Sequence, residues 1–291
     1  MNDKQRAFLA IFGYALLSGA MAAVTKVGLS QIPPFSFAFV RFFLATLIVG
    51  PFIWSKRRFL IQDFKALGPF SIFATLNIIF FVVGINLTTA NTSQILYAVV
   101  PIAVGLLTHF VLGEKLSLKK ITGITIGFIG TFLVLFLPIL EKGGKFAESL
   151  TGNILLAIAV VCCSGYIMLS KKAQKTHSPF HIVSIFIILT TIALFPFFLF
   201  ESISKYGWWN AININSALSM LYVVLAGTIS TYLLNQYSIK HGGTVFASMA
   251  FYLSPLFGFL VAFLLLGERL TTGLIIGGTL ALLGVYITTK K

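Results

Sequence analysis

Arg41 is the residue whose type and position point most directly to chemistry, because it lies about two helical turns into a long apolar run. An unpaired charge at the centre of a membrane-crossing helix costs about 2.5 kcal/mol or more. No acidic residue lies in the middle of any apolar run, so Arg41 is expected to face a wet cavity or a partner. Lys26 lies near the end of the preceding run and can face the same space or extend to the membrane surface. Together these two cations would attract an anionic group such as a carboxylate.

Uncharged polar side chains near the middle of the apolar runs are further candidates for substrate binding or translocation. They are Asn77, Tyr97, Ser164, Tyr166, Thr231, Tyr232, Asn235 and Tyr252. Hydroxyl and amide groups in an apolar setting need hydrogen-bond partners, which either a bound solute or a neighbouring helix supplies. A shared central pocket and helix–helix hydrogen bonding therefore both stay open for this set.

Two prolines and two glutamates are candidates for structural or gating roles. Pro101 and Pro255 fall inside apolar runs, where a proline removes a backbone hydrogen bond and bends the helix, as a fixed kink or as a flexing point. Glu114 and Glu268 each follow a glycine at the end of a run and precede a basic residue. The expectation for both is an anchor that pairs with the next residue or caps the following helix.

The histidines and cysteines give no sign of a cofactor. His109 lies near the end of an apolar run and is a candidate for proton coupling, since imidazole titrates near neutral pH. The four histidines are interpreted as scattered without metal-ligand spacing, and the adjacent cysteines as small packing residues. No metal and no cofactor are expected.

The composition indicates what must position these residues. The chain is 58% hydrophobic and only 10% charged, with a mean hydropathy of +0.98, whereas soluble domains carry about 25% charged residues. About 20 apolar residues form a membrane-crossing helix, and the sequence contains ten such runs. They span 7–29, 35–54, 66–87, 92–112, 118–138, 152–170, 180–200, 216–238, 244–266 and 271–289. The prediction is an all-α integral membrane protein, since strands of a barrel would be about half as long.

The distribution of lysine and arginine predicts the orientation. Most of these residues lie in alternate segments between the runs, namely 1–6, 55–65, 113–120, 171–179, 239–243 and the C-terminus. The positive-inside rule therefore predicts that both termini are cytoplasmic. The lysines and arginines behind the net charge of +14 would then lie at the cytoplasmic membrane surface beside anionic lipid. No nucleic-acid partner is expected. Short loops and the absence of a visible organellar signal suggest a multi-pass protein of the cell membrane.

The chain repeats itself at an offset of 154 residues. Pro101 matches Pro255, and the Leu-Gly-Glu at 112–114 matches that at 266–268. Matching glycines follow at 123 and 277 and at 130 and 284, at a spacing suited to close helix packing. Five runs per copy is an odd number, so the second copy would enter the membrane upside down, as in many secondary transporters. The expected units are 1–145 and 146–291.

These features resemble the drug/metabolite transporter superfamily, and within it the EamA-type permeases. The likeness rests on ten runs, the five-plus-five repeat and the twice-written Pro-x(10)-Leu-Gly-Glu before a glycine-rich run. The positions of Lys26 and Arg41 also resemble that family's pattern, whereas the second copy reads "VSIFIILTT" with no arginine. The resemblance implies export or exchange of small metabolites, often amino acids.

The sequence therefore predicts a secondary transporter that works by alternating access at a cavity between the two repeats. Its expected partners are a small-molecule substrate and the lipid bilayer, and the expected assembly is a monomer or a homodimer. A flippase for lipids or lipid-linked groups on the same fold is the alternative. An enzyme is not expected, because catalysis needs convergent acids, histidines or a metal site, and the runs contain no such cluster.

Overall fold

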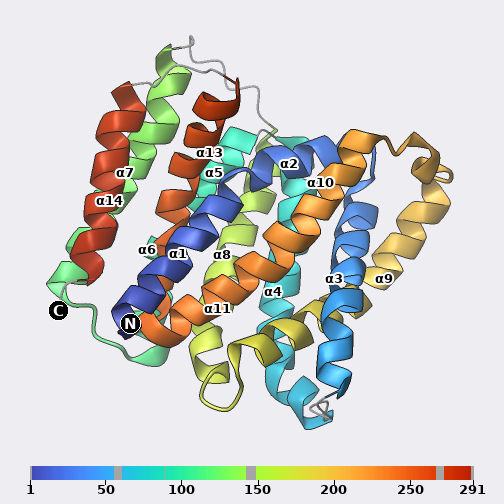
Figure 1. The fold of residues 1–291 in the computed structure, drawn as a ribbon, viewed down its shortest axis with the longest axis horizontal. Helices are drawn as coiled ribbons and strands as arrows, with labels where there is room; N and C mark the ends of the chain where they lie inside the picture. The colour runs from blue at the N-terminus through green and yellow to red at the C-terminus, as the bar shows by residue number, and fades with distance from the viewer. Residues whose placement is uncertain (1, 56–60, 89, 142–148, 267–271, 290–291) are drawn as a thin grey trace.

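The computed structural model describes residues 2–55, 61–88, 90–141, 149–266 and 272–289, and their regular structure is helical throughout (Figure 1). The helices are α1 (Asp3–Gly19), α2 (Met21–Leu29), α3 (Pro34–Ser55), α4 (Ile61–Leu87), α5 (Ala90–Tyr97), α6 (Val100–Leu112), α7 (Leu118–Glu141), α8 (Leu150–Ala173), α9 (Pro179–Ser204), η1 (Trp208–Ala211), α10 (Ile214–Val224), η2 (Leu225–Ser230), α11 (Thr231–Gly242), α12 (Thr244–Ser248), α13 (Ala250–Leu266) and α14 (Thr272–Thr289). Each apolar run in the sequence falls on one of these helices or on consecutive ones.

Seven helical segments within the described residues are long and apolar enough to cross a membrane. They are Asp3–Leu29, Pro34–Ile53, Ala66–Leu87, Thr92–Leu112, Leu150–Ala173, Pro179–Ser204 and Ile214–Gly242. Large apolar side chains such as Phe52, Phe110 and Leu218 are exposed on the outer faces of these helices. A surface of this kind suits contact with lipid. The chain is thus a multi-pass membrane protein, while the ten-span topology and the cytoplasmic termini stay predictions.

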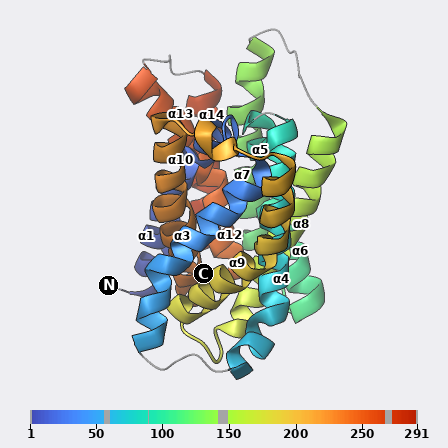
Figure 2. The ribbon, with the colours of Figure 1, turned by 90° about the vertical axis from the view of Figure 1, so that its right-hand side faces the viewer.

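The helices pack in four main pairs, α7 with α14, α4 with α8, α3 with α9, and α1 with α11. The α7–α14 pair lies at one edge of the molecule and the α3–α9 pair at the other (Figure 1). Figure 2 views the molecule from the α3–α9 edge. In every main pair one helix comes from the first half of the chain and one from the second.

Glycines bring α7 and α14 into backbone contact. A Cβ atom added to Gly123 would lie 2.7 Å from the carbonyl oxygen of Gly284, and one on Gly284 would lie 2.6 Å from that of Gly123. Gly130 likewise faces the carbonyl oxygen of Gly277. No side chain fits at these crossings, so the glycine spacing seen in the sequence serves helix packing between the two halves.

Several membrane-length segments are interrupted near their middle. The first turns at Ala20, between α1 and α2, and the fourth breaks at Ala98 and Val99, between α5 and α6. Pro101 lies in the first turn of α6, directly after this break, so the span does change direction at the proline, but between two helices and not within one. Pro255 does lie inside a helix, α13. The segment Ile214–Gly242 contains the π-helix η2, a wide turn that is frequent at functional sites.

Candidate functional site

A cavity of about 150 Å³ lies between the two halves of the chain. Its walls come from α1, α2, α3, α4, α5, α8, η2, α11 and α13. The lining residues are Tyr14, Ser18, Met21, Ala22, Arg41, Ala74, Asn77, Ile78, Phe81, Ser93, Gln94, Tyr97, Cys163, Tyr166, Ile167, Gly227, Thr231, Tyr232, Asn235, Phe251, Ser254 and Pro255. One cation, several hydroxyls and amides, and aromatic rings thus share one space. No acidic residue is among the lining residues that the structure describes.

Arg41 is the charged group of this cavity and is only 4% exposed. Its Nε donates to Thr228 Oγ1 at 2.6 Å and its Nη2 donates to the Gly227 carbonyl at 2.9 Å. Its Cζ lies 5.2 Å from the centre of the Phe42 ring, within cation–π range. In the described part of the chain no carboxylate pairs with Arg41 and Nη1 has no hydrogen-bond acceptor. A buried cation without a counter-ion favours an anion beside it.

The π-helix η2 provides the acceptors for Arg41. Thr228 Oγ1 donates to the carbonyl of Val223, five residues earlier, while it accepts from Arg41. The Gly227 carbonyl accepts from both Arg41 and Thr231 Oγ1. A wide turn thus presents two oxygens to the guanidinium across the boundary between the halves.

Asn77 and Tyr97 meet on the first-half side of the cavity. Asn77 Nδ2 donates to Tyr97 Oη at 2.6 Å and to the Ala159 carbonyl at 2.8 Å. The Tyr97 ring packs edge-on against Phe81 and also contacts Phe251. Both amide protons of Asn77 are therefore used within the protein, and Asn77 holds the Tyr97 hydroxyl at the cavity wall.

Tyr166 and Tyr232 form the second-half side together with Asn235. Their rings meet edge-on, with centroids 5.7 Å apart. Gln236 Nε2 donates to Tyr166 Oη at 2.8 Å and to Ser170 Oγ at 2.7 Å, which ties α11 to α8. Asn235 Oδ1 is buried and has no hydrogen-bond partner within the described residues. Such an acceptor in a cavity wall is available to a donor on a bound solute.

Seven of the ten residues that the sequence suggested for binding line this cavity: Arg41, Asn77, Tyr97, Tyr166, Thr231, Tyr232 and Asn235. The other three do not. Lys26 is exposed on α2, beyond the turn at Ala20, and Ser164 is buried with its Oγ donating to the Val160 carbonyl one turn back. Tyr252 is fully buried with its Oη donating to the Ile124 carbonyl of α7, so it serves helix packing.

The gating and coupling candidates lie in different places. Pro255 lines the cavity, and Pro101 does not. Glu114 forms an ion pair of 2.6 Å with Lys171 on α8 instead of pairing with Lys115. His109 is exposed and its Nδ1 lies 3.0 Å from the Glu114 carbonyl oxygen, outside the cavity. Glu268 lies outside the described residues.

Sequence reasoning missed some of the cavity and one cluster outside it. Tyr14, Gln94 and Cys163 line the cavity, but nothing in their sequence neighbourhood separates them from packing residues. Phe251 also lines it, and its match to Tyr97 at the repeat offset of 154 was the available signal. The expectation of scattered histidines is wrong. His177 and His181 converge on Asp63, and their spacing of four residues was the available signal. Asp63 and His177 are 114 residues apart in sequence, so the carboxylate that the two histidines share could not be assigned beforehand.

Apolar helices around a central cavity that carries one cation and several hydroxyl and amide groups define this chain as a multi-pass membrane protein. Comparison with known proteins then gives the family: residues 5–136 and 150–290 match the EamA-like transporter family, and the chain belongs to it. The family accordingly indicates a membrane transporter.

Individual relatives agree with this assignment. An uncharacterized transporter of Archaeoglobus fulgidus is 26% identical over the whole chain and 99% of its own length. The uncharacterized transporter YoaV of Bacillus subtilis is 23% identical, covering 98% of this chain and 97% of its own. A WAT1-related chloroplast protein of Arabidopsis thaliana is 21% identical over 92% of this chain and 65% of its own. A solved structure, titled only as the crystal structure of a protein, has the same fold, with a TM-score of 0.75 at 17% identity over 98% of this chain and 97% of its own.

Proposed function

We propose that this protein is a secondary transporter that exports or exchanges a small metabolite bearing an anionic group, such as an amino acid or a related compound. The observation that carries the proposal is Arg41, a buried guanidinium in the central cavity with no carboxylate partner among the described residues. A carboxylate of the solute would neutralise this charge and accept from Nη1. The aromatic walls and the unpaired Asn235 oxygen would hold the rest of the molecule.

The helix pairs support alternating access between two inverted repeats, 1–145 and 146–291. Under the repeat, α1 and α2 correspond to α8, α3 to α9, α4 to α10 and α11, and α7 to α14. Exchanging the halves then maps the α1–α11 pair onto the α8–α4 pair and leaves the α3–α9 and α7–α14 pairs unchanged. A pseudo-twofold axis between the halves requires a set of contacts that is preserved under this exchange, and the odd number of runs per copy would place that axis in the membrane plane.

The chemistry of the cavity favours exchange or uniport over coupling through a carboxylate. No acid lines the cavity in the part of the chain that the structure describes, and the sequence contains no P-loop motif for nucleotide hydrolysis. The proposed mechanism does not route a proton through His109, since its imidazole lies outside the cavity. The proposed setting is the cell membrane, with both termini cytoplasmic, as a monomer or homodimer without nucleic acid.

The test is counterflow in proteoliposomes with a panel of labelled amino acids and related metabolites. Wild type, Arg41→Gln and Arg41→Lys are compared, with Lys26→Gln as a matched loss of one exposed cation. Losing a charged hydrogen bond to the solute should weaken exchange about ten- to a hundred-fold in Arg41→Gln. The Lys26→Gln variant should match wild type.

Two results would overturn parts of this proposal. Unchanged exchange in a folded Arg41→Gln variant would remove Arg41 from the solute path while keeping the transporter. Absence of exchange for every metabolite, together with translocation of a fluorescent lipid across the same vesicles, would replace metabolite transport with lipid handling.

A further inference from the structure

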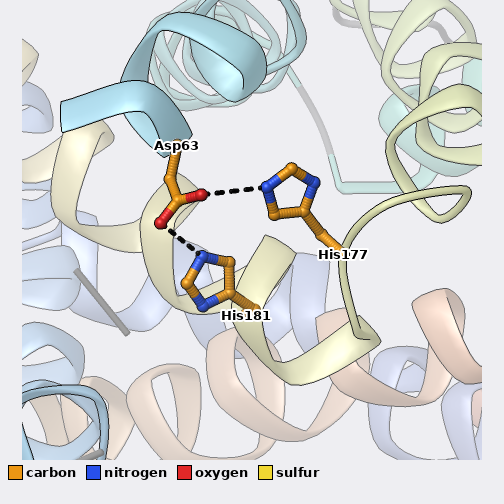
Figure 3. A group of neighbouring side chains, drawn as sticks. All are labelled: Asp63, His177 and His181. Carbon is orange, nitrogen blue, oxygen red and sulfur yellow. Dashed lines mark hydrogen bonds and ion pairs between the residues drawn. The ribbon is translucent and has the colours of Figure 1, made fainter. Parts of the chain in front are cut away.

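A carboxylate and two imidazoles meet beside the start of α9, and none of the three residues lines the central cavity (Figure 3). Asp63 lies near the start of α4, His177 just before α9, and His181 in the first turn of α9. His177 Nε2 lies 3.1 Å from Asp63 Oδ1, and His181 Nε2 lies 3.2 Å from Asp63 Oδ2. Both ring nitrogens thus point at the same carboxyl group from the second half of the chain (Figure 3).

The local backbone holds the two imidazoles in place. Ser178 is the N-cap of α9, its Oγ accepting from the His181 backbone N–H at 3.3 Å, and Pro179 occupies the first helical position. A capped helix start with a proline is rigid. The His177 and His181 rings stack there, with centroids 5.4 Å apart and planes 13° from parallel. The side chains of the cluster are 11–16% exposed, so a small ion and a water molecule can reach them.

Thr176 completes the surroundings of His177. Its Oγ1 lies 2.7 Å from His177 Nδ1, on the side of the ring away from Asp63. Histidines that bind a metal through one nitrogen usually have a hydrogen-bond partner on the other, which fixes the tautomer and the ring orientation. A hydroxyl can accept from Nδ1–H, leaving the Nε2 lone pair for a ligand.

We propose that Asp63, His177 and His181 form a binding site for a divalent transition metal of the Zn²⁺ class. One candidate ligand atom from each residue lies within 4.8 Å of the others, a grouping that a small shift of rotamers contracts around one ion. Two imidazoles and a carboxylate suit zinc and its neighbours, whereas Mg²⁺ and Ca²⁺ prefer oxygen ligands alone. Water would fill the fourth position of a tetrahedral site.

Hydrogen bonding alone is the competing explanation for this cluster. A second histidine–aspartate contact is an example of hydrogen bonding without the geometry of a metal site. His241 Nδ1 lies 2.8 Å from Asp3 Oδ1, and this exposed carboxylate meets a single imidazole. The cluster at Asp63 differs because a second imidazole reaches the other oxygen of the same group and the site is largely buried. His241 and Asp3 therefore serve as a matched control.

Metal binding would clamp two packed helices together. α4 and α9 already contact each other, and α4 also carries Asn77 at the cavity wall. An ion that binds the folded protein and not the unfolded chain raises its melting temperature. The clamp does not depend on the proposed transport, because it requires only the fold.

The experiment uses the full-length protein, purified in detergent and stripped with a chelator, and titrated with ZnCl₂ by isothermal calorimetry. The expected result is a single Zn²⁺ per chain with a raised melting temperature and no competition by Mg²⁺. Asp63→Asn, His177→Gln and His181→Gln should each weaken binding at least tenfold. Thr176→Val should weaken it roughly ten- to a hundred-fold through the loss of the second hydrogen bond. His241→Gln should bind like wild type.

Zinc binding that persists unchanged in His177→Gln and His181→Gln would place the ion elsewhere and overturn the proposal. Absence of zinc binding to folded wild type would also overturn the proposal. The cluster would then be a hydrogen-bonded contact between α4 and the start of α9. Should the variants fail to fold, X-ray absorption of zinc-loaded wild type decides, since a site without two imidazole ligands contradicts the assignment.

Discussion

Arg41 and Thr228 hydrogen-bond across the two halves of the chain, with 2.6 Å between Nε and Oγ1. The pair joins α3 to the π-helix η2 at the wall of the central cavity. The hydroxyl therefore sets the direction in which the only guanidinium of the described cavity lining points.

Thr228→Val removes this acceptor while keeping the shape of the side chain. Arg41 would then lose one of its two anchors, and solute binding should weaken by about tenfold, seen as a raised KM in counterflow. Thr46→Val is the control. Thr46 lies on α3, as Arg41 does, and its hydroxyl bonds to that of Thr191 away from the cavity lining. Equal KM values for the two variants would contradict the positioning role of Thr228.

Two tyrosines that each lose one hydroxyl should behave differently. Tyr97→Phe leaves an Asn77 proton without its acceptor at the cavity wall, so the KM for the solute should change. Tyr252→Phe removes the hydrogen bond from Oη to the Ile124 carbonyl in the helix packing and should lower stability by about 1 kcal/mol with an unchanged KM. Counterflow and thermal melting of both variants separate the two roles, and a shifted KM for Tyr252→Phe would contradict them.

Gly284→Ala should destabilise the protein by about 1–3 kcal/mol, because the new methyl group would lie 2.6 Å from the Gly123 carbonyl oxygen. Gly50→Ala is the matched control, since a Cβ there meets no atom within 4 Å. Melting temperatures in detergent test the contrast. A Gly284→Ala variant as stable as Gly50→Ala would show that α7 and α14 separate easily.

Glu114 and Glu201 form ion pairs with Lys171 and Lys205, respectively, but they should differ in their contribution to stability. Glu114 pairs with Lys171 where both side chains are partly exposed, so Glu114→Gln should cost about 1 kcal/mol or less. Glu201 is buried and its Oε2 accepts from the backbone N–H and the Oγ of Ser36, at 2.7 and 3.1 Å, at the start of α3. Glu201→Ala should cost about 1–3 kcal/mol. Equal melting temperatures for the two variants would refute this ranking.

The helical character of the apolar runs could be predicted because length and composition decide it locally. Arg41 could be assigned to a cavity from energetics alone, since a charge in an apolar run needs water or a partner. Its actual acceptors could not, because they lie 186 and 187 residues away on a π-helix that no periodicity indicated.

The orientation of side chains around each helix was the other limit. Tyr97 and Tyr252 look alike in sequence, yet one faces the cavity and the other packs on α7. At the repeat offset of 154 the residue that matches Tyr97 is Phe251, which also lines the cavity, whereas Tyr252 is one residue out of this register. One residue along a helix turns a side chain by about 100° around the axis, and which face meets the cavity depends on tertiary packing. The same limit hid the meeting of Asp63 with the two histidines.

The contact of bare backbones between α7 and α14 has a mechanical consequence. Interlocked glycines at 123, 130 and 284 leave no clearance for one helix to slide along the other. Relative motion of the halves would instead have to be a hinge rotation about this edge. The largest displacement would then fall at the far edge, where aromatic rings of α3 and α9 such as Phe39 and Phe198 stack.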